Sequence, residues 1–253
     1  MKHIDLNCDL GEGAGHDAEL MPLITSANIA CGAHAGDEAT MRATVTLAKQ
    51  HGVAIGAHPG FADLENFGRR ELPVSPGEVQ GLVHDQVLKL QLMARGLGAR
   101  LAHVKPHGAL YNMAARDPAL ARAVVDAIYE VDPRLVLFGL AGSHLIAVAD
   151  ACGLPVASEV FADRTYQADG SLTPRSQPRA FIADDAAAVA QVLRMVREGR
   201  VRALDGTDVD IRAETVCVHG DGARPVDFVR RLRAELQAAG VEVEAFEAGS
   251  HSH

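Results

Sequence analysis

The stretch at residues 101–112 joins an apolar segment to polar side chains that can do chemistry. The apolar part stops at Pro106 and Gly108, two residues that a central β-strand accommodates poorly. Lys105, His107 and Tyr111 gather at this stop. Burying an ammonium group at a strand end is costly unless the charge is paired or used. The alternative is a lysine whose head group reaches solvent beyond the strand.

Similar polar side chains follow nearly every other apolar segment of the chain. They are Asp9 and Glu12, then Asn28, His34 and Asp37, then His58, then Glu159, Asp163 and Arg164, and finally His219 and Asp221. Solvated loop residues should vary freely in type, whereas nearly every strand end here carries His, Asp, Glu or Lys. The pattern therefore favours one convergent site.

Carboxylates and imidazoles together are suited to general acid–base catalysis on a small polar substrate. Lys105 can stabilise a developing oxyanion or phosphoryl charge. Arginines can hold a substrate carboxylate by two parallel hydrogen bonds, although a solvated loop is an equal alternative for Arg69 and Arg70. The predicted catalytic residues are Asp9, His58, Lys105 and His107. The predicted substrate-binding residues are Glu12, Asn28, His34, Asp37, Arg69, Arg70, Tyr111, Glu159, Arg164, His219 and Asp221.

The same residues offer ligands for a metal ion, with Asp9, His58 and His107 as the obvious oxygen and nitrogen donors. The sequence contains no HxxH or HExxH spacing that would support a metal site locally. We therefore assign no residue as a metal ligand. Whether the protein binds a metal ion tightly is left open. A GxxxxGK[ST] phosphate loop is also absent, because no Gly-Lys pair occurs in the chain, and no Rossmann glycine pattern follows the first strand.

Apolar runs and helical periodicity alternate along the chain. The predicted strands are 3–8, 26–31, 53–57, the segment from 101, 134–139, 155–161, 215–218 and 241–246. The predicted helices run from Asp37 to Gly52, from a capping box at Ser75, over 118–131, through Leu145 and Val148, over 186–197 and over 225–239. Asp205-Gly206 indicates a small hairpin. The long polar segment 167–178 is predicted as a lid or binding loop, with a disordered excursion as the alternative.

This alternation predicts right-handed βαβ units and a largely parallel sheet. Seven or eight repeats favour a closed (β/α) barrel-like α/β fold over an open sheet. The length of 253 residues, 48% of them hydrophobic, suits a single domain over residues 1–248, followed by a flexible tail at 249–253.

Composition excludes several classes of partner. A net charge of -9 and a pI of about 5.7 argue against nucleic acid or an anionic membrane. No apolar run approaches the roughly 20 residues of a membrane span, and the first residues do not resemble a signal peptide. The cysteines show no CxxC spacing, and three lie in apolar runs, which predicts buried reduced thiols and a cytoplasmic protein.

Several stretches resemble the LamB/YcsF family, and together they cover nearly the whole chain. They are DLNCDLGE at 5–12, NIACGAHAGD at 28–37, GAHPG at 56–60, FGRR at 67–70, VKPHGALYN at 104–112, EVFADR at 159–164 and VHGD at 218–221. The combination is specific, although each piece alone is not. The short tail lies outside the resemblance.

The resemblance implies a barrel similar to that of polysaccharide deacetylases. It also implies ATP-driven opening of the 5-oxoproline ring to glutamate, with Mg²⁺ for nucleotide use and partner subunits B and C. The missing phosphate loop leaves nucleotide binding to an unusual site or to a partner protein, and a homo-oligomer is compatible with the sequence. Two alternatives stay open: a metal-dependent amidase or deacetylase that works without ATP, and a non-catalytic subunit that binds substrate or partner proteins.

Overall fold

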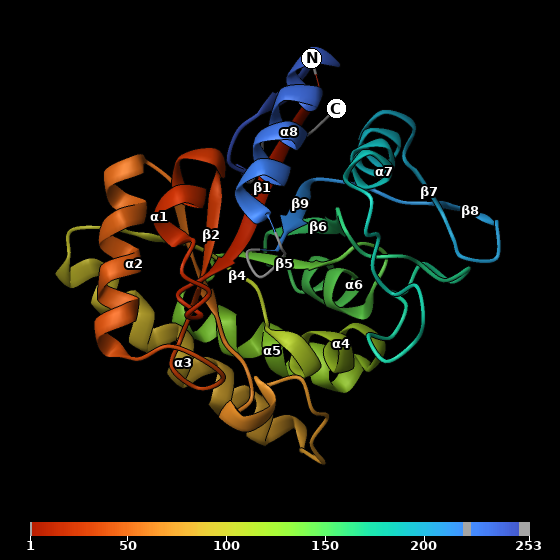
Figure 1. The fold of residues 1–253 in the computed structure, drawn as a ribbon. Coiled ribbons are helices and arrows are strands. Elements are labelled where there is room, and N and C mark those ends of the chain that lie inside the picture. The colour runs from red at the N-terminus through yellow and green to blue at the C-terminus, as the bar shows by residue number, and fades with distance from the viewer. Residues whose placement is uncertain (1, 220–223, 248–253) are drawn as a thin grey trace.

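The computed structural model describes residues 2–219 and 224–247 (Figure 1). Within these residues, parallel strands form a closed barrel in the order β1-β2-β3-β4-β5-β6-β9, and β9 pairs back with β1. Their bounds are β1 Lys2–Leu10, β2 Ser26–Ala30, β3 Ala54–His58, β4 Leu101–Val104, β5 Val136–Leu140, β6 Val156–Phe161 and β9 Thr215–Val218. The predicted parallel barrel is therefore confirmed.

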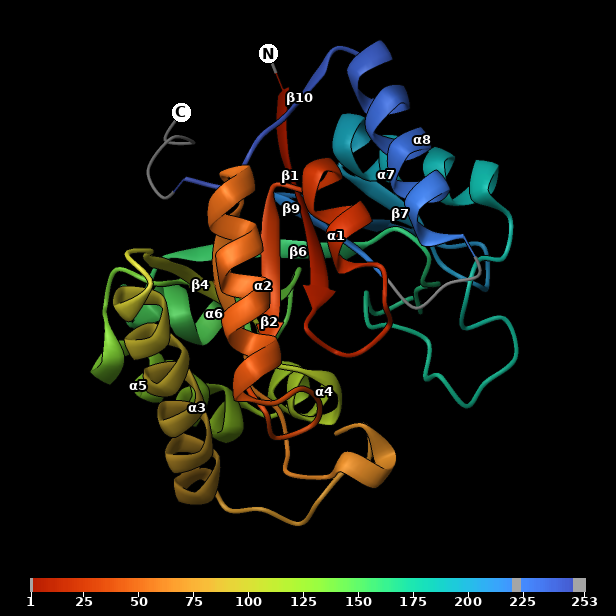
Figure 2. The ribbon, with the colours of Figure 1, turned by 60° about the vertical axis from the view of Figure 1, so that its left-hand side comes forward.

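The last strand, β10 (Val241–Val243), lies outside the closure. It pairs in parallel with the first residues of β1, with Lys2 opposite Val241 and Ile4 opposite Val243 (Figure 2). The prediction of a strand over 241–246 was too long, because the ladder with β1 ends at Val243. The first residues of β1 therefore pair with β10, and the later ones belong to the barrel.

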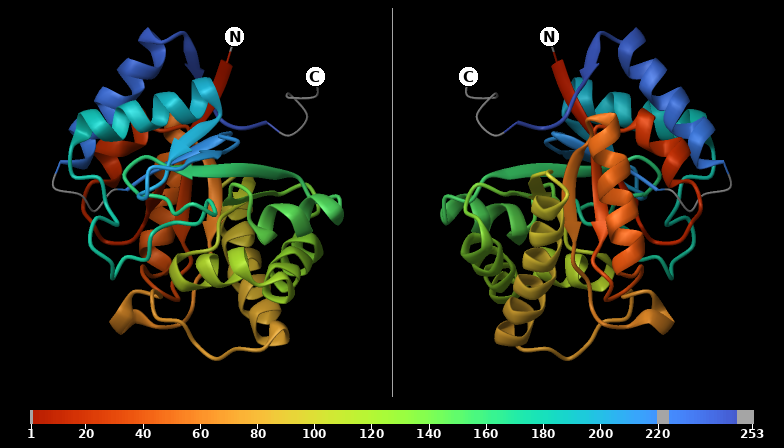
Figure 3. Two further views of the ribbon diagram at one scale, coloured as in Figure 1. Left: turned by 90° about the vertical axis from the view of Figure 1, so that its right-hand side faces the viewer. Right: turned by 90° about the vertical axis from the view of Figure 1, so that its left-hand side faces the viewer.

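Helices cover the outside of the barrel (Figure 3). The longer ones are α2 Glu38–His51, α3 Pro76–Gly96, α4 Gly108–Arg116, α5 Pro118–Val131, α6 His144–Ala151, α7 Asp185–Glu198 and α8 Pro225–Ala238. The short ones are α1 Asp17–Leu20, η1 Met21–Leu23 and η2 Leu64–Asn66. The predicted helix over 118–131 is confirmed. Sequence reasoning missed α4, because the polar residues at 105–112 indicated only the end of a strand.

Local signals set several helix ends. Ser75 and Glu78 form the predicted capping box at the start of α3, each side chain accepting from the other residue's backbone N–H. Asp37 caps α2, which ends at Gly52 in the left-handed conformation at φ 68°.

The strands bury both of their faces. Every residue of β2 and β5 is buried, because one face packs under helices and the other points into the barrel. The inward face of β1 carries Asp5 and Asn7, which are 1% and 0% exposed, so the barrel interior is polar along part of its length. This polar interior continues to the carboxyl ends of the strands.

The predicted hairpin around Asp205-Gly206 is confirmed as β7 (Arg200–Arg202) and β8 (Asp208–Asp210), which pair in antiparallel fashion apart from the barrel. Leu172 of the segment 167–178 makes an isolated antiparallel bridge with Tyr166, which precedes the segment. Among the described residues, no helix has both the length and the apolar character needed to cross a bilayer. A single domain over 1–248 stays a prediction, and the predicted tail at 249–253 lies outside the described residues.

Candidate active site at the carboxyl ends of the strands

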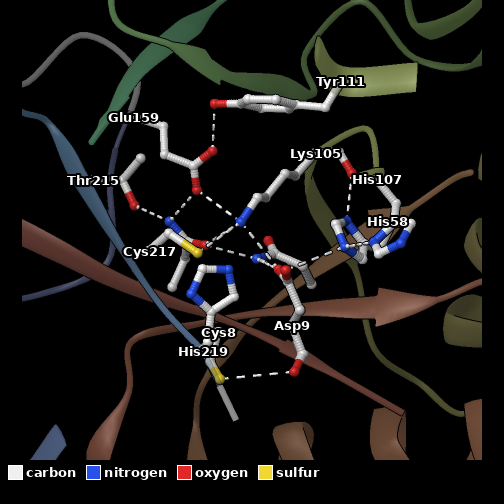
Figure 4. Close-up of polar contacts among 12 residues, drawn as sticks. Cys8, Asp9, His58, Lys105, His107, Tyr111, Glu159, Thr215, Cys217 and His219 are labelled. Carbon is white, nitrogen blue, oxygen red and sulfur yellow. Dashed lines mark hydrogen bonds and ion pairs between the residues drawn. The ribbon is translucent and has the colours of Figure 1, made fainter. Parts of the chain in front are cut away.

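Lys105 follows β4 directly and is 3% exposed, so the alternative of a head group in solvent is wrong. Its Nζ lies 2.8 Å from Glu159 Oε1 and 3.0 Å from Asp9 Oδ1 (Figure 4). It also lies 3.1 Å from both Asn7 Oδ1 and Cys217 Sγ. The ammonium group thus joins β1, β6 and β9 through four neighbours.

The charged side chains around Lys105 shift one another's pKa values. Burial alone lowers the pKa of Lys105, but the neighbouring Asp9, Cys217 and Glu159 raise it well above its usual value. Burial alone raises the pKa of Asp9, but His58 and Lys105 hold it well below its usual range. Lys105 therefore stays an ammonium and Asp9 a carboxylate.

Glu159 is fully buried on β6 and uses both carboxylate oxygens. Its Oε1 accepts from Asn7 Nδ2 at 3.0 Å in addition to Lys105, and its Oε2 accepts from the Tyr111 hydroxyl at 2.7 Å. Burial and the charge of Glu159 raise the pKa of Tyr111 well above its usual value. Tyr111 is therefore a fixed hydrogen-bond donor in this site.

A second group, the imidazole cluster, consists of Glu12, His34, His58 and His107. The rings of His34 and His107 stack at 3.7 Å, and His107 Nδ1 lies 3.0 Å from His58 Nε2. Glu12 Oε1 lies 3.0 Å from His34 Nε2, and Asp9 Oδ2 lies 3.4 Å from His58 Nε2. Asp9 thus contacts both the ammonium group and the imidazole cluster.

The three imidazoles differ in charge. Burial opposes protonation of His58, but Asp9 and Glu12 raise its pKa above the usual value. Burial and the charge of His58 lower the pKa of His107 to about 2, and burial also lowers the pKa of His34. His107 is therefore neutral and can act only as an acceptor or a ligand through its free ring nitrogen.

Side-chain amides inside the barrel orient the site. His103 Nε2 lies 2.8 Å from Asn28 Oδ1, and Asn28 Nδ2 donates to Asn7 Oδ1 at 2.7 Å and to Asp9 Oδ1 at 2.8 Å. Burial lowers the pKa of His103 to about 3, so the ring is neutral and donates one hydrogen bond to Asn28. This chain of hydrogen bonds from His103 to Asp9 fixes the orientation of the Asn28 and Asn7 amides.

These groups open on one cavity, which also takes in residues of the 167–178 segment. Its charged and polar lining includes Asp9, Glu12, His58, Arg69, Lys105, His107, Tyr111, Asn112, Arg164, Arg175 and His219. The lining holds cations, carboxylates and imidazoles within one small volume. Such a surface can bind a small anionic substrate and transfer protons to it.

Other predicted site residues lie apart from this cavity or are engaged elsewhere. Asp37 lies on the surface, where its Oδ1 accepts from the backbone N–H of Thr40. Arg70 is exposed and faces Asp63 at 3.5 Å. The structure thus does not bring either residue to the cavity. Asp37 is a helix cap, and Arg70 lies in the loop after η2. Asp221 lies outside the described residues.

Two further residues line the cavity with side chains that already have partners. Arg164 donates to the carbonyl oxygens of Ala180 and Thr173, so it holds the 167–181 region against β6. His219 Nδ1 lies 2.8 Å from Asp163 Oδ1, which joins the ends of β6 and β9.

Sequence reasoning missed the residues within the strands, namely Asn7, His103, Thr215 and Cys217. A signal was present for one of them. Asp5, Asn7 and Asp9 alternate along β1, and a period of two places all three on the same face of a strand. No comparable pattern marks His103, a single polar residue in a buried run, or Cys217, which reads as one more apolar position.

A closed parallel α/β barrel with a polar site at the carboxyl ends of its strands is the class of protein that fold and site define. The LamB/YcsF family model matches residues 4–251, and the chain belongs to this family. The 5-oxoprolinase A subunit from Geobacillus kaustophilus is 59% identical over 249 residues, which cover 97% of each chain.

Solved structures agree with this fold. A lactam utilization protein from Thermus thermophilus is 48% identical, with a TM-score of 0.90 over 97% of this chain and 100% of the other. A family 4 carbohydrate esterase from Streptomyces lividans is 11% identical, with a TM-score of 0.52 over 97% of this chain and 93% of the other. The second likeness concerns the fold alone and confirms the predicted deacetylase-type barrel.

Proposed function

We propose that this chain is the A subunit of an ATP-dependent 5-oxoprolinase, a hydrolase that opens the lactam of 5-oxo-L-proline to give L-glutamate. The observation that carries the proposal is the identity of 59% with a protein named as the A subunit of 5-oxoprolinase, over nearly the full length of both chains. The similarity to a lactam utilization protein supports the same substrate class. The cavity lining of cations, carboxylates and imidazoles is compatible with an anionic cyclic amide.

The chemistry of a lactam explains why ATP is needed. An amide carbonyl is a poor electrophile, and transfer of a phosphoryl group to its oxygen activates the carbon toward water. Attack by one water breaks the ring C–N bond and leaves an acyl phosphate, and a second water cleaves the acyl phosphate and releases phosphate. The amine and the new carboxylate of glutamate result, while ATP has become ADP.

The site supplies groups for these steps. Lys105 places a positive charge on the cavity wall, where it stabilises negative charge on the carbonyl oxygen or on a phosphoryl group. Asp9 and His58 form the acid–base pair that handles the attacking water and the leaving amine, and the neutral His107 lies beside His58 as a hydrogen-bond acceptor. Arg69, whose guanidinium lies 4.8 Å from the centroid of the Phe67 ring, is the candidate for the substrate carboxylate.

We further propose that subunits B and C complete the enzyme and that Mg²⁺ accompanies ATP. The support is the name of the relatives as one component of a 5-oxoprolinase, together with the lack of a phosphate loop in this chain. ATP then binds to a partner or at an interface with one. Free cysteines throughout the described residues support a reducing, cytoplasmic location.

The first experiment measures glutamate release from 5-oxoproline by this chain mixed with subunits B and C, with and without ATP. Release should require ATP and all three proteins. Lys105→Met should lower kcat by about 100-fold or more, because it removes a charge from the reacting centre. Lys49→Met is the matched control, since Lys49 lies on the surface and donates to the carbonyl oxygen of Leu97.

Other outcomes point to the alternatives. Amide hydrolysis by this chain alone, without ATP, would favour an independent amidase. Full turnover by variants at Asp9, Lys105 and His107 would favour a non-catalytic binding subunit. No release from an assembled and folded complex would refute the proposal. Binding of labelled ATP to each separate protein identifies the one that holds the nucleotide.

A further inference from the structure

We propose that the imidazole cluster binds a divalent transition-metal ion, with Zn²⁺ as the best match to its ligands. Glu12, His34, His58 and His107 each offer one ligand atom, and these four atoms lie within 4.8 Å of one another. Imidazole nitrogens with one carboxylate oxygen form a ligand set typical of zinc and its first-row neighbours. The inference rests on the geometry of the cluster and is independent of the substrate proposed above.

The hydrogen bonds of two imidazoles leave two nitrogens facing each other. His58 Nδ1 lies 2.7 Å from the carbonyl oxygen of Lys105, and His107 Nε2 lies 2.8 Å from the carbonyl oxygen of Phe67. A carbonyl oxygen only accepts, so each of these nitrogens carries a ring hydrogen. The other nitrogens, His58 Nε2 and His107 Nδ1, lie 3.0 Å apart, and both are acceptors when the rings are neutral.

Two acceptors at this distance repel each other unless a cation lies between or beside them. A metal ion bound to both nitrogens supplies this cation. Glu12 adds a negative oxygen to the same point, 3.4 Å from His107 Nδ1 and 3.7 Å from His58 Nε2. Ligands at about 2.0–2.1 Å from a tetrahedral zinc ion are about 3.3 Å apart. The separations among the ligand atoms of His58, His107 and Glu12, 3.0–3.7 Å, are therefore close to the spacing that a metal ion requires.

The surroundings hold the ligands as in a metal site. The carbonyl oxygens of Lys105 and Phe67 accept from the ring N–H opposite the free nitrogen, the contact that metal-binding histidines usually make. Backbone also packs against the rings: a Cβ at Gly60 would lie 2.8 Å from His34 Nδ1, and one at Gly68 would lie 2.8 Å from His34 Cβ. The rings cannot turn away without moving the chain.

The site also has access to solvent and to a substrate. The histidines are 1–4% exposed, whereas the Glu12 side chain is 13% exposed and lines the cavity with His58 and His107. An ion held here faces the same cavity as Lys105. It can accept a water or a substrate oxygen as a further ligand.

The test measures metal binding directly. The whole chain, carrying His251→Ala and His253→Ala so that these histidines cannot bind metal, is stripped with a chelator and titrated with Zn²⁺ by calorimetry. We expect one ion per chain, and the Co²⁺-loaded protein should show the visible absorption of a four-coordinate site. His58→Ala and His107→Ala should each weaken Zn²⁺ binding by about 100-fold or more.

Controls separate this site from other donors and from unfolding. Glu12→Gln keeps the shape of the side chain and should weaken binding by about 10-fold or more, with an unchanged circular dichroism spectrum. His3→Ala should leave binding unchanged, although His3 also lies in a group of possible donors with Glu242 and Glu244. A stripped protein that does not bind Zn²⁺ or Co²⁺, or binding lost in His3→Ala but not in Glu12→Gln, would overturn the proposal. Neither outcome depends on glutamate release.

Discussion

Lys105 is the positive charge that balances the buried carboxylate of Glu159 and the partly buried carboxylate of Asp9, so its removal should destabilise the protein as well as inactivate it. Lys105→Met leaves Asp9 and Glu159 without a cation at 2.8–3.0 Å. Breaking a buried ion pair from one side costs about 3–5 kcal/mol. Urea unfolding should show a loss of that size.

Lys49→Met supplies the comparison for unfolding too. It removes one exposed hydrogen bond to a carbonyl oxygen, so its cost should stay below about 1 kcal/mol. Equal losses in the two variants would show that the Lys105 charge is not coupled to the buried carboxylates.

Tyr111 tests the other oxygen of Glu159. Tyr111→Phe removes the hydroxyl that donates at 2.7 Å and leaves a buried carboxylate oxygen unsatisfied. We expect a loss of about 1–3 kcal/mol in the free energy of unfolding. Tyr129→Phe, at a tyrosine that is 51% exposed, should change it by less than about 0.5 kcal/mol. Similar effects of both substitutions would contradict the assigned role.

At the scale of elements, strand β3 contains a glycine that makes room for a side chain of the next strand. A Cβ at Gly56 would lie 2.0 Å from His103 Nε2, so Gly56→Ala must displace the ring that orients Asn28. We expect a loss of at least about 1–3 kcal/mol in unfolding free energy, together with lower turnover.

Two variants check this explanation. Gly81→Ala, in helix α3 where nothing lies within 4 Å of the new Cβ, should be neutral or stabilise by up to about 1 kcal/mol. Combining Gly56→Ala with His103→Ala should cost less than the sum of the single changes, because the clash disappears. Strict additivity would exclude the clash as the cause.

Helix α2 provides a test of Asp37, which the sequence suggested as a substrate ligand. Asp37→Ala removes the cap that accepts from Thr40, and should cost about 1 kcal/mol in unfolding free energy. KM for 5-oxoproline should not change, and Asp37→Ser should restore most of the stability. A raised KM with unchanged stability would return Asp37 to the site.

At the scale of the whole molecule, the contact between Asp163 and His219 links stability to pH. Burial raises the pKa of Asp163, but His219, a backbone hydrogen bond and Arg164 together outweigh burial, and the pKa lies below its usual value. A depressed pKa stabilises the native state above the unfolded value of about 3.9, and this stability is lost as the pH falls through the native value. Asp163→Asn should therefore destabilise the protein above about pH 5 and make little difference at the lowest pH.

Urea unfolding of both proteins between about pH 3 and pH 7 measures this difference. The gap between wild type and Asp163→Asn should narrow as the pH falls. A gap that is constant or widens toward acid would show that the carboxylate does not stabilise the fold through its charge.

The sequence was enough to predict the barrel, because apolar runs alternate with helical patterns and each strand end carries a polar residue. It could also place Asp9, His58, Lys105 and His107 at one edge. It could not predict the partners of Lys105 within the strands, because Cys217 is more than 100 residues away and reads as one apolar position among others. For Asp37 and Arg70 the sequence allowed two roles each, because a helix cap and a surface arginine share their residue types with ligands, and the structure shows the cap and the surface position.

The pairing of β1 with β9 has a consequence for synthesis on the ribosome. Asp5 pairs with Thr215 and Cys8 with Val218, so the barrel closes only after β9 has been made. At about 5–20 residues per second, translation of the segment between the two strands takes roughly 10–40 s. Until then Lys105 lacks Cys217, and Asn7 lacks Thr215. Before β9 is made, the barrel of the nascent chain is open, and the charged groups that are buried in the finished protein are still hydrated. Chaperones that shield exposed strands would bind the chain at this stage.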